Sequence, residues 1–314
     1  VDMDEKSLAA EGWPLQRDKW AQLVTKLFDQ YGIRAMGYDM TFPEPDTRIS
    51  SMLDTLLSTE LADQPVVAER APAIKQKFNY DQQWADALRG RAVVMGVAFN
   101  TISSTDDAST AGALCAPLMD KTATSLYAVD FFKARGYAAN VPVLQEAAGY
   151  CGFFDNPRQD DDGVFRRVPL VQMYDGVIYP SLAFQLTRLA LGNPGVEFEF
   201  EPQDARSSLN LERVRIGPVS APVDGDVAVY VPYRGNPFTY EYISVTDVIH
   251  GTVEKPERLK GAIVLVGTSA AGLLDFRVTP VSRTHPGVEV HASIVSGFLD
   301  GNIRQQAPYY NGIE

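Results

Sequence analysis

Apolar residues along the chain change repeatedly between the spacing of a helix and that of a buried strand. Residues 20–28 carry apolar side chains at helical spacing behind the capping residue Asp18, and Gly32 ends this predicted helix. Residues 33–42 then form an apolar run that is typical of a strand. The pattern therefore predicts a helix that leads directly into a strand.

The same succession recurs further along the chain. Helices are predicted over residues 51–61 and 80–88, and Gly90 separates the second of them from a strand over residues 92–99. A β-branched run at residues 262–266 predicts another strand, buried on both faces. Because buried strands that alternate with helices are typical of α/β proteins, we expect a mixed, largely parallel central sheet with helices on both faces.

The middle of the chain has a different pattern, in which short strands are joined by polar turns. Pro180 is expected at the first position of a helix that Gly192 ends, and Ser244 is expected to cap a later helix. An antiparallel subregion is predicted from strand-like segments at residues 149–177, 196–200, 214–216 and 227–232.

One segment has no clear periodicity. Residues 101–112 are rich in Ser, Thr, Asp and Ala and predict an exposed loop, so we interpret residues 101–140 as a loop-rich insertion. No linker in the chain is long enough to require two domains. We therefore expect one domain over residues 1–314.

Composition narrows the class of protein. With 314 residues, of which 45% are hydrophobic, the chain can bury a large core. Its net charge of −12 argues against binding to nucleic acid and to anionic membrane surfaces, both of which attract clusters of Lys and Arg. The long uncharged stretch at residues 261–274 is too short to span a membrane, and residues 1–6 lack the features of a signal peptide. We interpret the chain as an excised fragment or a mature form.

Several motifs occur in a fixed order along the chain. The last of them lies in a segment where the strand at residues 262–266 leads into a glycine turn and the polar residues Asp275, Arg277 and Thr279. The most specific motifs are residues 37–42 (GYDMTF), 160–167 (DDDGVFRR), 179–183 (YPSLA) and 286–292 (PGVEVHA). In this order they resemble the CHASE2 family of extracytoplasmic sensor domains. The resemblance covers nearly the whole chain except residues 101–140, where no motif matches.

The resemblance implies a signal receiver and not an enzyme. CHASE2 domains are periplasmic or extracellular parts of membrane proteins, with transmembrane helices on their flanks and a cytoplasmic output domain. The implied output is an adenylate or guanylate cyclase, a histidine or Ser/Thr kinase, or a diguanylate cyclase. The implied partner is an unknown small molecule or an envelope signal, with no cofactor, and a homodimer is compatible with this class.

The two cysteines bear on the cellular compartment in which the chain functions. Cys115 and Cys151 are 36 positions apart and could close a stabilising loop in an oxidising environment. Two unpaired thiols remain an equal alternative on residue types alone.

A candidate ligand site is expected at the carboxyl edge of the sheet, where open α/β sheets form clefts. Asp39 ends an otherwise apolar strand, and the competing interpretation is a structural carboxylate that accepts hydrogen bonds from the backbone or from Arg277. On a strand, Arg166 and Arg167 point to opposite faces, so one is expected inward and the other in solvent. The expected site residues are Asp39, Arg166, Arg167, Asp275, Arg277, Thr279 and His291.

Other chemistries are weighed against this site. A metal-dependent hydrolase could use Asp275, Glu289 and His291 if they converged. Residues 160–163 superficially match a calcium loop, but the spacing of its ligands is missing, so a solvated turn is favoured. Residues 267–272 lack the end of a phosphate loop, and no nucleophile elbow is present. A third alternative is a cell-envelope interaction module, for which Tyr309 and Tyr310 provide slight support.

Overall fold

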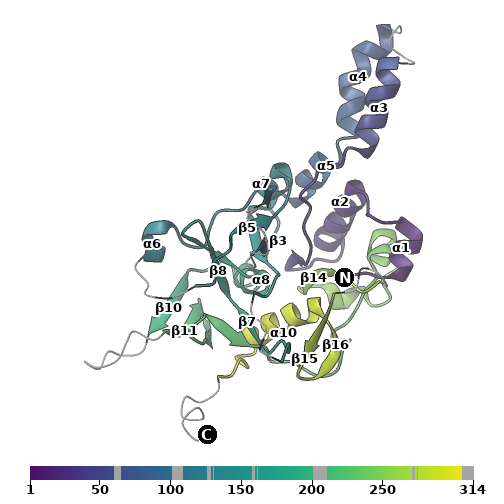
Figure 1. The fold of residues 1–314 in the computed structure, drawn as a ribbon. Coiled ribbons are helices and arrows are strands. Elements are labelled where there is room, and N and C mark those ends of the chain that lie inside the picture. The colour runs from purple at the N-terminus through teal and green to yellow at the C-terminus, as the bar shows by residue number, and fades with distance from the viewer. Residues whose placement is uncertain are drawn as a thin grey trace, which may run out of the picture.

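The computed structural model describes residues 1–59, 65–100, 109–125, 129, 131–157, 160, 162–200, 211–270, 273 and 275–305. Figure 1 shows a body of strands and helices from which one helical hairpin projects. None of the described helices is long and apolar enough to cross a membrane.

The central sheet is mixed and largely parallel, as the sequence predicts. Its parallel core runs in the order β1, β14, β2, β3, and β6 also pairs with β3 in parallel. The strand β5 pairs with β3 in the opposite direction, and β4 pairs with β5. The bounds are β1 (Asp2–Met3), β2 (Ala35–Tyr38), β3 (Val93–Asn100), β4 (Thr110–Ala111), β5 (Gly136–Ala138), β6 (Tyr150–Phe153) and β14 (Ile263–Thr268).

Helices cover both faces of this sheet because successive strand residues point to opposite sides. On β2, Met36 faces a core beneath α1, α2, η1, α5, α7 and α9, whereas Ala35 faces a second core beneath α8 and α10. The first group comprises α1 (Glu5–Glu11), α2 (Arg17–Thr25), η1 (Lys26–Gln30), α5 (Tyr80–Leu88), α7 (Pro142–Ala148) and α9 (Val245–His250). The second comprises α8 (Leu182–Ala190) and α10 (Gly287–Leu299).

Aromatic packing and one glycine fix the two layers. Trp20 of α2 stacks on Trp84 of α5 with ring centroids 5.9 Å apart, and both rings are fully buried. On the other face, a Cβ at Gly152 of β6 would lie 2.6 Å from the Cα of Leu182. This position therefore requires glycine for α8 to pack so closely on the sheet.

The predicted antiparallel subregion is present as several small sheets. They are β10 (Val196–Phe200), β11 (Leu211–Ile216) and β12 (Val219–Pro222); β7 (Arg167–Pro169) with β13 (Ala228–Tyr230); β8 (Val171–Tyr174) with β9 (Val177–Pro180); and β15 (Phe276–Thr279) with β16 (Ser282–Pro286). The remaining short helices are α6 (Lys121–Ser125) and η2 (Pro256–Leu259). The β15–β16 hairpin was not expected from the sequence.

Some predicted boundaries are wrong. Pro180 ends β9, where it pairs with Val171, and the helix starts later because Ser181 caps it by accepting a hydrogen bond from the Phe184 amide. The expected loop at residues 101–112 contains the short strand β4, while residues 101–108 lie outside the described part of the chain.

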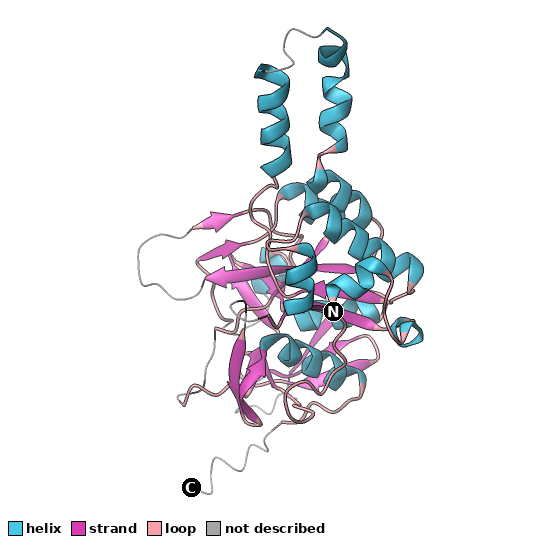
Figure 2. Ribbon diagram, turned by 90° about the vertical axis from the view of Figure 1, so that its right-hand side faces the viewer, coloured by secondary structure: helices cyan, strands magenta, loops and turns pink. Residues whose placement is uncertain are grey.

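A hairpin of α3 (Arg48–Thr59) and α4 (Pro65–Lys77) projects from the body, as Figures 1 and 2 show. No side chain of α3 is buried, and all of its residues are described. At its base, Arg17 donates to Asp81 at 3.1 Å, and Asp81 also accepts the Asp46 amide. The hairpin is thus anchored at its base and exposed along its length.

We predict that the hairpin contributes little to the stability of the body. Replacing residues 48–77 by a short Gly/Ser linker should lower the free energy of unfolding by less than about 1 kcal/mol, because α3 buries no side chain. Urea unfolding measures this change, with Trp84→Ala as a control that should cost roughly 3–5 kcal/mol. A loss as large as that of the control would contradict the prediction.

Candidate functional site

Asp39 and His291 meet at the carboxyl edge of the sheet. Asp39 directly follows β2, and His291 lies in the second turn of α10. The Asp39 Oδ1 is 3.7 Å from the His291 Nε2, and their side chains are only 7% and 6% exposed. The structure therefore brings together two of the predicted site residues in a buried position.

The β15–β16 hairpin closes this edge. Arg277 pairs with Asp275 at 2.8 Å, and its guanidinium lies 5.3 Å from the centre of the Phe165 ring. The amide of Gly287, the first residue of α10, donates to the Asp275 carbonyl at 2.7 Å. Asp275 and Arg277 are therefore tied to the start of the helix that carries His291.

Burial shifts the pKa values of the pair in opposite directions. The pKa of Asp39 is raised to about 7, mainly by burial and also by Asp275, while Arg277 opposes the shift. The pKa of His291 is lowered to about 4, mainly by burial and also by the nearby Arg277 charge, while the Phe154 backbone opposes the shift. Near neutral pH, His291 is therefore uncharged and Asp39 is close to its midpoint of protonation.

The cavity at this edge is small. It has a volume of about 20 Å³ and is lined by residues that include Asn156, Phe165, Asp275, Arg277 and His291. This is enough for about one water molecule, which needs roughly 10–15 Å³. The buried Nδ1 of His291 makes no hydrogen bond within the described residues. In this conformation the edge is suited to a water molecule or a proton, and it is too small for an organic ligand.

Sequence analysis missed a second acidic residue at this edge. Asp155 lies two residues beyond the end of β6, and its carboxylate accepts hydrogen bonds from the Phe99 amide at 2.7 Å and from Gln172 at 3.0 Å. Burial raises its pKa to about 6. An acidic residue within two positions of the end of a buried strand was the signal that could have identified it.

The two arginines do not join this site, and the expectation of opposite environments is wrong. Arg166 and Arg167 both pair with Asp160, at 3.0 and 2.7 Å. Arg166 also binds Asp162, and Arg167 also binds Asp224. Because Arg166 lies just before β7, it is not held to the alternation of that strand. These contacts favour a structural ion-pair cluster. They also occupy the carboxylates of Asp160 and Asp162, two residues of the segment that superficially matches a calcium loop. The third, Asp161, lies outside the described residues.

The hydrogen bonds of Thr279 give this residue a structural role that needs no ligand. Its hydroxyl donates to the Ser282 carbonyl and accepts from the Ser282 amide, both at 3.1 Å. It therefore closes the turn between β15 and β16.

The residues of the alternative hydrolase are not brought together. Residues two apart on a helix point to different sides, so Glu289 and His291 diverge on α10. Glu289 instead lies 3.4 Å from His285, while Asp275 is paired with Arg277. Across the described ranges, no group of three or more His, Cys, Asp or Glu residues could hold a metal ion.

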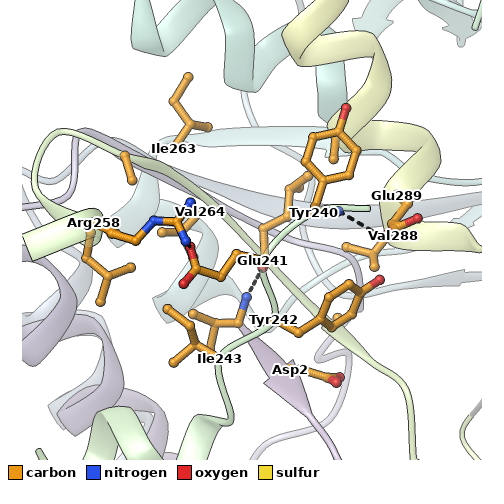
Figure 3. A pocket seen from close by; sticks show the side chains of 16 residues that line it. Asp2, Tyr240, Glu241, Tyr242, Ile243, Arg258, Ile263, Val264, Val288 and Glu289 are labelled. Atoms are coloured by element: carbon orange, nitrogen blue, oxygen red, sulfur yellow. Dashed lines mark hydrogen bonds and ion pairs between the residues drawn. The ribbon is translucent and has the colours of Figure 1, made fainter. Parts of the chain in front are cut away.

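A larger pocket lies on the other side of α10, and sequence analysis did not identify it. Its volume is about 230 Å³, and it is bounded by the first two residues of the chain, the segment before α9, η2, β14 and α10. Figure 3 shows Tyr240, Tyr242 and Glu289 around it, together with the ion pair of Arg258 and Glu241 at 3.0 Å. This pocket has room for a small organic molecule.

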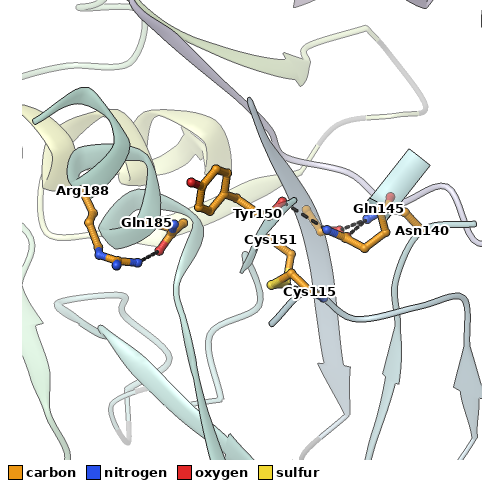
Figure 4. The surroundings of a disulfide bond; sticks show 8 residues. Cys115, Asn140, Gln145, Tyr150, Cys151, Gln185 and Arg188 are labelled. Atoms are coloured by element: carbon orange, nitrogen blue, oxygen red, sulfur yellow. Dashed lines mark hydrogen bonds between the residues drawn. A yellow bond between two sulfur atoms is a disulfide. The ribbon is translucent and has the colours of Figure 1, made fainter. Parts of the chain in front are cut away.

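The structure contains a disulfide between Cys115 and Cys151, the alternative that residue types alone left open. Their Cα atoms are 5.5 Å apart, and Figure 4 shows that the bond ties the segment before α6 to β6. Cys151 is buried beside the central strand β3, with which β6 pairs. The bond thus fastens part of the region at residues 101–140, where the sequence shows no family motif, to the core.

Comparison with known proteins gives one finding. The family model described as CHASE2 domain matches residues 1–312, which is essentially the whole chain. Neither the curated proteins nor the solved structures include a significant match.

We predict opposite pH dependences when Asp39 or His291 is removed. Folding raises the Asp39 pKa from 3.8 to about 7. The protonated carboxyl group therefore contributes stability that is fully present below pH 3.8 and is lost as pH rises through 7. It lowers the His291 pKa from 6.5 to about 4, so the stability from neutral His291 is lost as pH falls through 4. In the wild-type protein these two contributions largely cancel between pH 4 and 6.5.

Relative to wild type, Asp39→Asn should therefore gain stability as pH rises from 4 to 7, whereas His291→Gln should lose it. Each change should be on the order of 2–4 kcal/mol, from about 1.36 kcal/mol per pKa unit. Denaturant unfolding at several pH values measures both, with the exposed Glu254→Gln as control. A difference from wild type that does not vary with pH would contradict the assignment.

We also predict that the disulfide stabilises the fold. The double substitution Cys115→Ser with Cys151→Ser should lower the free energy of unfolding by roughly 2–4 kcal/mol, because the unfolded chain gains conformational entropy when the bond is absent. Reduction of the wild-type protein should cause a similar loss in urea unfolding. Equal midpoints for oxidised and reduced protein would show that the bond does not contribute.

Proposed function

The chain belongs to the CHASE2 family of extracytoplasmic sensor domains, and we propose that it receives a signal there and passes it to an output domain through a displacement of α10. CHASE2 domains occur in membrane signalling proteins that carry such output domains. The finer proposal concerns where in this domain the signal acts.

The observation that carries the proposal is that α10 contacts every candidate sensing region. Its first turn contacts Asp275, and His291 faces Asp39. Glu289 lines the larger pocket, and Phe298 packs against Phe184 of α8 with ring centroids 5.8 Å apart. A change at either sensing region would therefore alter the packing of one helix.

Two inputs fit this arrangement. A molecule that fills the pocket would press on one side of α10, and a proton gained or lost at Asp39 would change the contacts of the other side. Either input shifts a balance between two arrangements only if it interacts differently with each of them. A small shift of a packed helix is a common way to convey such a bias.

The output domain that we expect is an adenylate or guanylate cyclase, a histidine or Ser/Thr kinase, or a diguanylate cyclase. This expectation rests on the proteins in which CHASE2 domains are used, as does the expectation that a homodimer forms. The chain itself then acts as the receiver, and the catalytic step belongs to the output domain.

One observation favours a second candidate function, an interaction module of the cell envelope. The projecting hairpin exposes apolar side chains, with Met52 71% and Val66 64% exposed. Exposed apolar surface of this kind favours contact with another macromolecule. The tyrosines at positions 309 and 310, which supported this alternative in the sequence, lie outside the described residues.

We predict that a single methyl group at the start of α10 changes signalling. In Gly287→Ala the new Cβ would lie 2.5 Å from the Asp275 Oδ2 and 3.2 Å from the Asp275 carbonyl oxygen, so Asp275 must move and its contact with the start of α10 changes. In the membrane-bound signalling protein that contains this domain, the basal output should change by roughly fivefold or more, equivalent to about 1 kcal/mol between two states. The output is measured as product formed per molecule of protein in membranes.

The matched control is Gly195→Ala, where the added Cβ meets nothing within 4 Å. It should leave the output unchanged. If Gly287→Ala folds, as judged by its thermal unfolding, and yet signals like the control, the proposal that α10 transmits the signal is wrong.

A further inference from the structure

The larger pocket contains a buried acceptor that the protein satisfies only through long or poorly aligned contacts. Glu289 is only 2% exposed, and its Oε1 accepts a long hydrogen bond of 3.4 Å from the Tyr240 amide. Its Oε2 accepts no hydrogen bond within the described residues, although the His285 Nε2 lies 3.4 Å away. A buried carboxylate oxygen that receives no hydrogen bond of good geometry is weakly satisfied, so it can accept a further donor.

A second polar group lies beside it. The hydroxyl of Tyr242 is buried and forms no hydrogen bond of normal geometry among the described residues. It nevertheless lies within hydrogen-bonding reach of Glu289, which the backbone amides of Phe238 and Thr239 also approach. A ligand with several N–H groups could donate to both oxygens at once.

The charged groups that line the pocket bear on the charge of the ligand. Asp2, Glu241 and Glu289 supply three carboxyl groups to the lining. Its cationic groups are Arg258, which is paired with Glu241, and the amino group of Val1, which donates to the Leu265 carbonyl and whose pKa burial lowers to about 6. The rings of Tyr240 and Tyr242 stand on the same side of the pocket in Figure 3. Aromatic faces attract cations, so both features favour a positively charged ligand.

The rest of the pocket is apolar and limits the size of the ligand. Aliphatic side chains come from β14 and α10, and they include Ile263, Leu265, Val288 and Ala292. The pocket volume of about 230 Å³ is more than ten times that of the edge cavity, about 20 Å³. The occupant is therefore a small molecule with an apolar body and one polar end.

We propose that this pocket binds a small organic ammonium ion, with its charged group between Glu289 and Tyr242 and its apolar body against Val288 and Ala292. The inference deepens the proposed function, because it names the class of signal and places it against α10. Only the link to signalling rests on that function, since binding is a property of the chain itself.

The test compares three probes of the same shape and different charge on the purified chain. Benzylammonium should bind in calorimetric and NMR titrations, benzyl alcohol should bind at least about tenfold more weakly, and benzoate should not bind up to about 10 mM. Glu289→Gln should weaken the affinity for benzylammonium about tenfold or more, whereas the exposed Glu254→Gln variant should bind it like wild type. NMR shifts should centre on α10 and residues 240–243.

A second variant protects the test against misfolding. Ala292→Leu adds bulk to the apolar wall without changing any charge, and it should abolish binding even if Glu289→Gln proves unstable. The proposal is overturned if benzylammonium does not bind, if benzyl alcohol binds equally well, or if Ala292→Leu leaves binding intact. If the probe binds as expected but does not alter the output of the membrane protein, the pocket assignment stands and the signalling function fails.

Discussion

The structure depends on the burial of one parallel sheet on both of its faces. The strands β14, β2, β3 and β6 carry apolar side chains alternately to two separate cores, so helices must cover each side. Once both faces are covered, the ends of the strands are the places where polar residues can reach the sheet. Asp39 and Asp155 occupy two of these ends, and their burial raises both pKa values. The chemistry at the edge thus follows from the architecture.

The same burial explains why the edge is not a simple binding cleft. Arg277 is held by Asp275 and by the ring of Phe165, and α10 begins directly against this hairpin. The remaining space is close to the size of one water molecule. A buried carboxyl group and a neutral imidazole in so small a space respond to protons more readily than to organic molecules. The larger cavity lies across the helix, where aromatic and aliphatic side chains replace the polar ones.

How far the sequence predicts this arrangement depends on how local each feature is. The parallel sheet and the buried Asp39 follow from apolar runs and their order, and these are properties of single segments. Arg166, Arg167 and Thr279 were expected at the ligand site, but their contacts are ion pairs or a turn formed with short-range neighbours such as Asp160 and Ser282. Residue type gave no way to separate these contacts from ligand contacts. The larger pocket could not be predicted, because it is formed by five segments, from the first residues of the chain to α10, that meet only in the folded chain.

The geometry of α10 links the two regions in a way that neither shows alone. Glu289 and His291 are two positions apart, so they project to different sides of the same helix. One enters a pocket with an excess of carboxyl groups, and the other faces Asp39 across 3.7 Å. A rotation of the helix that improves one set of contacts must move the other set. If the proposed ligand rotates the helix, occupation of the pocket and protonation of Asp39 would be coupled, and by linkage each would change the affinity of the other.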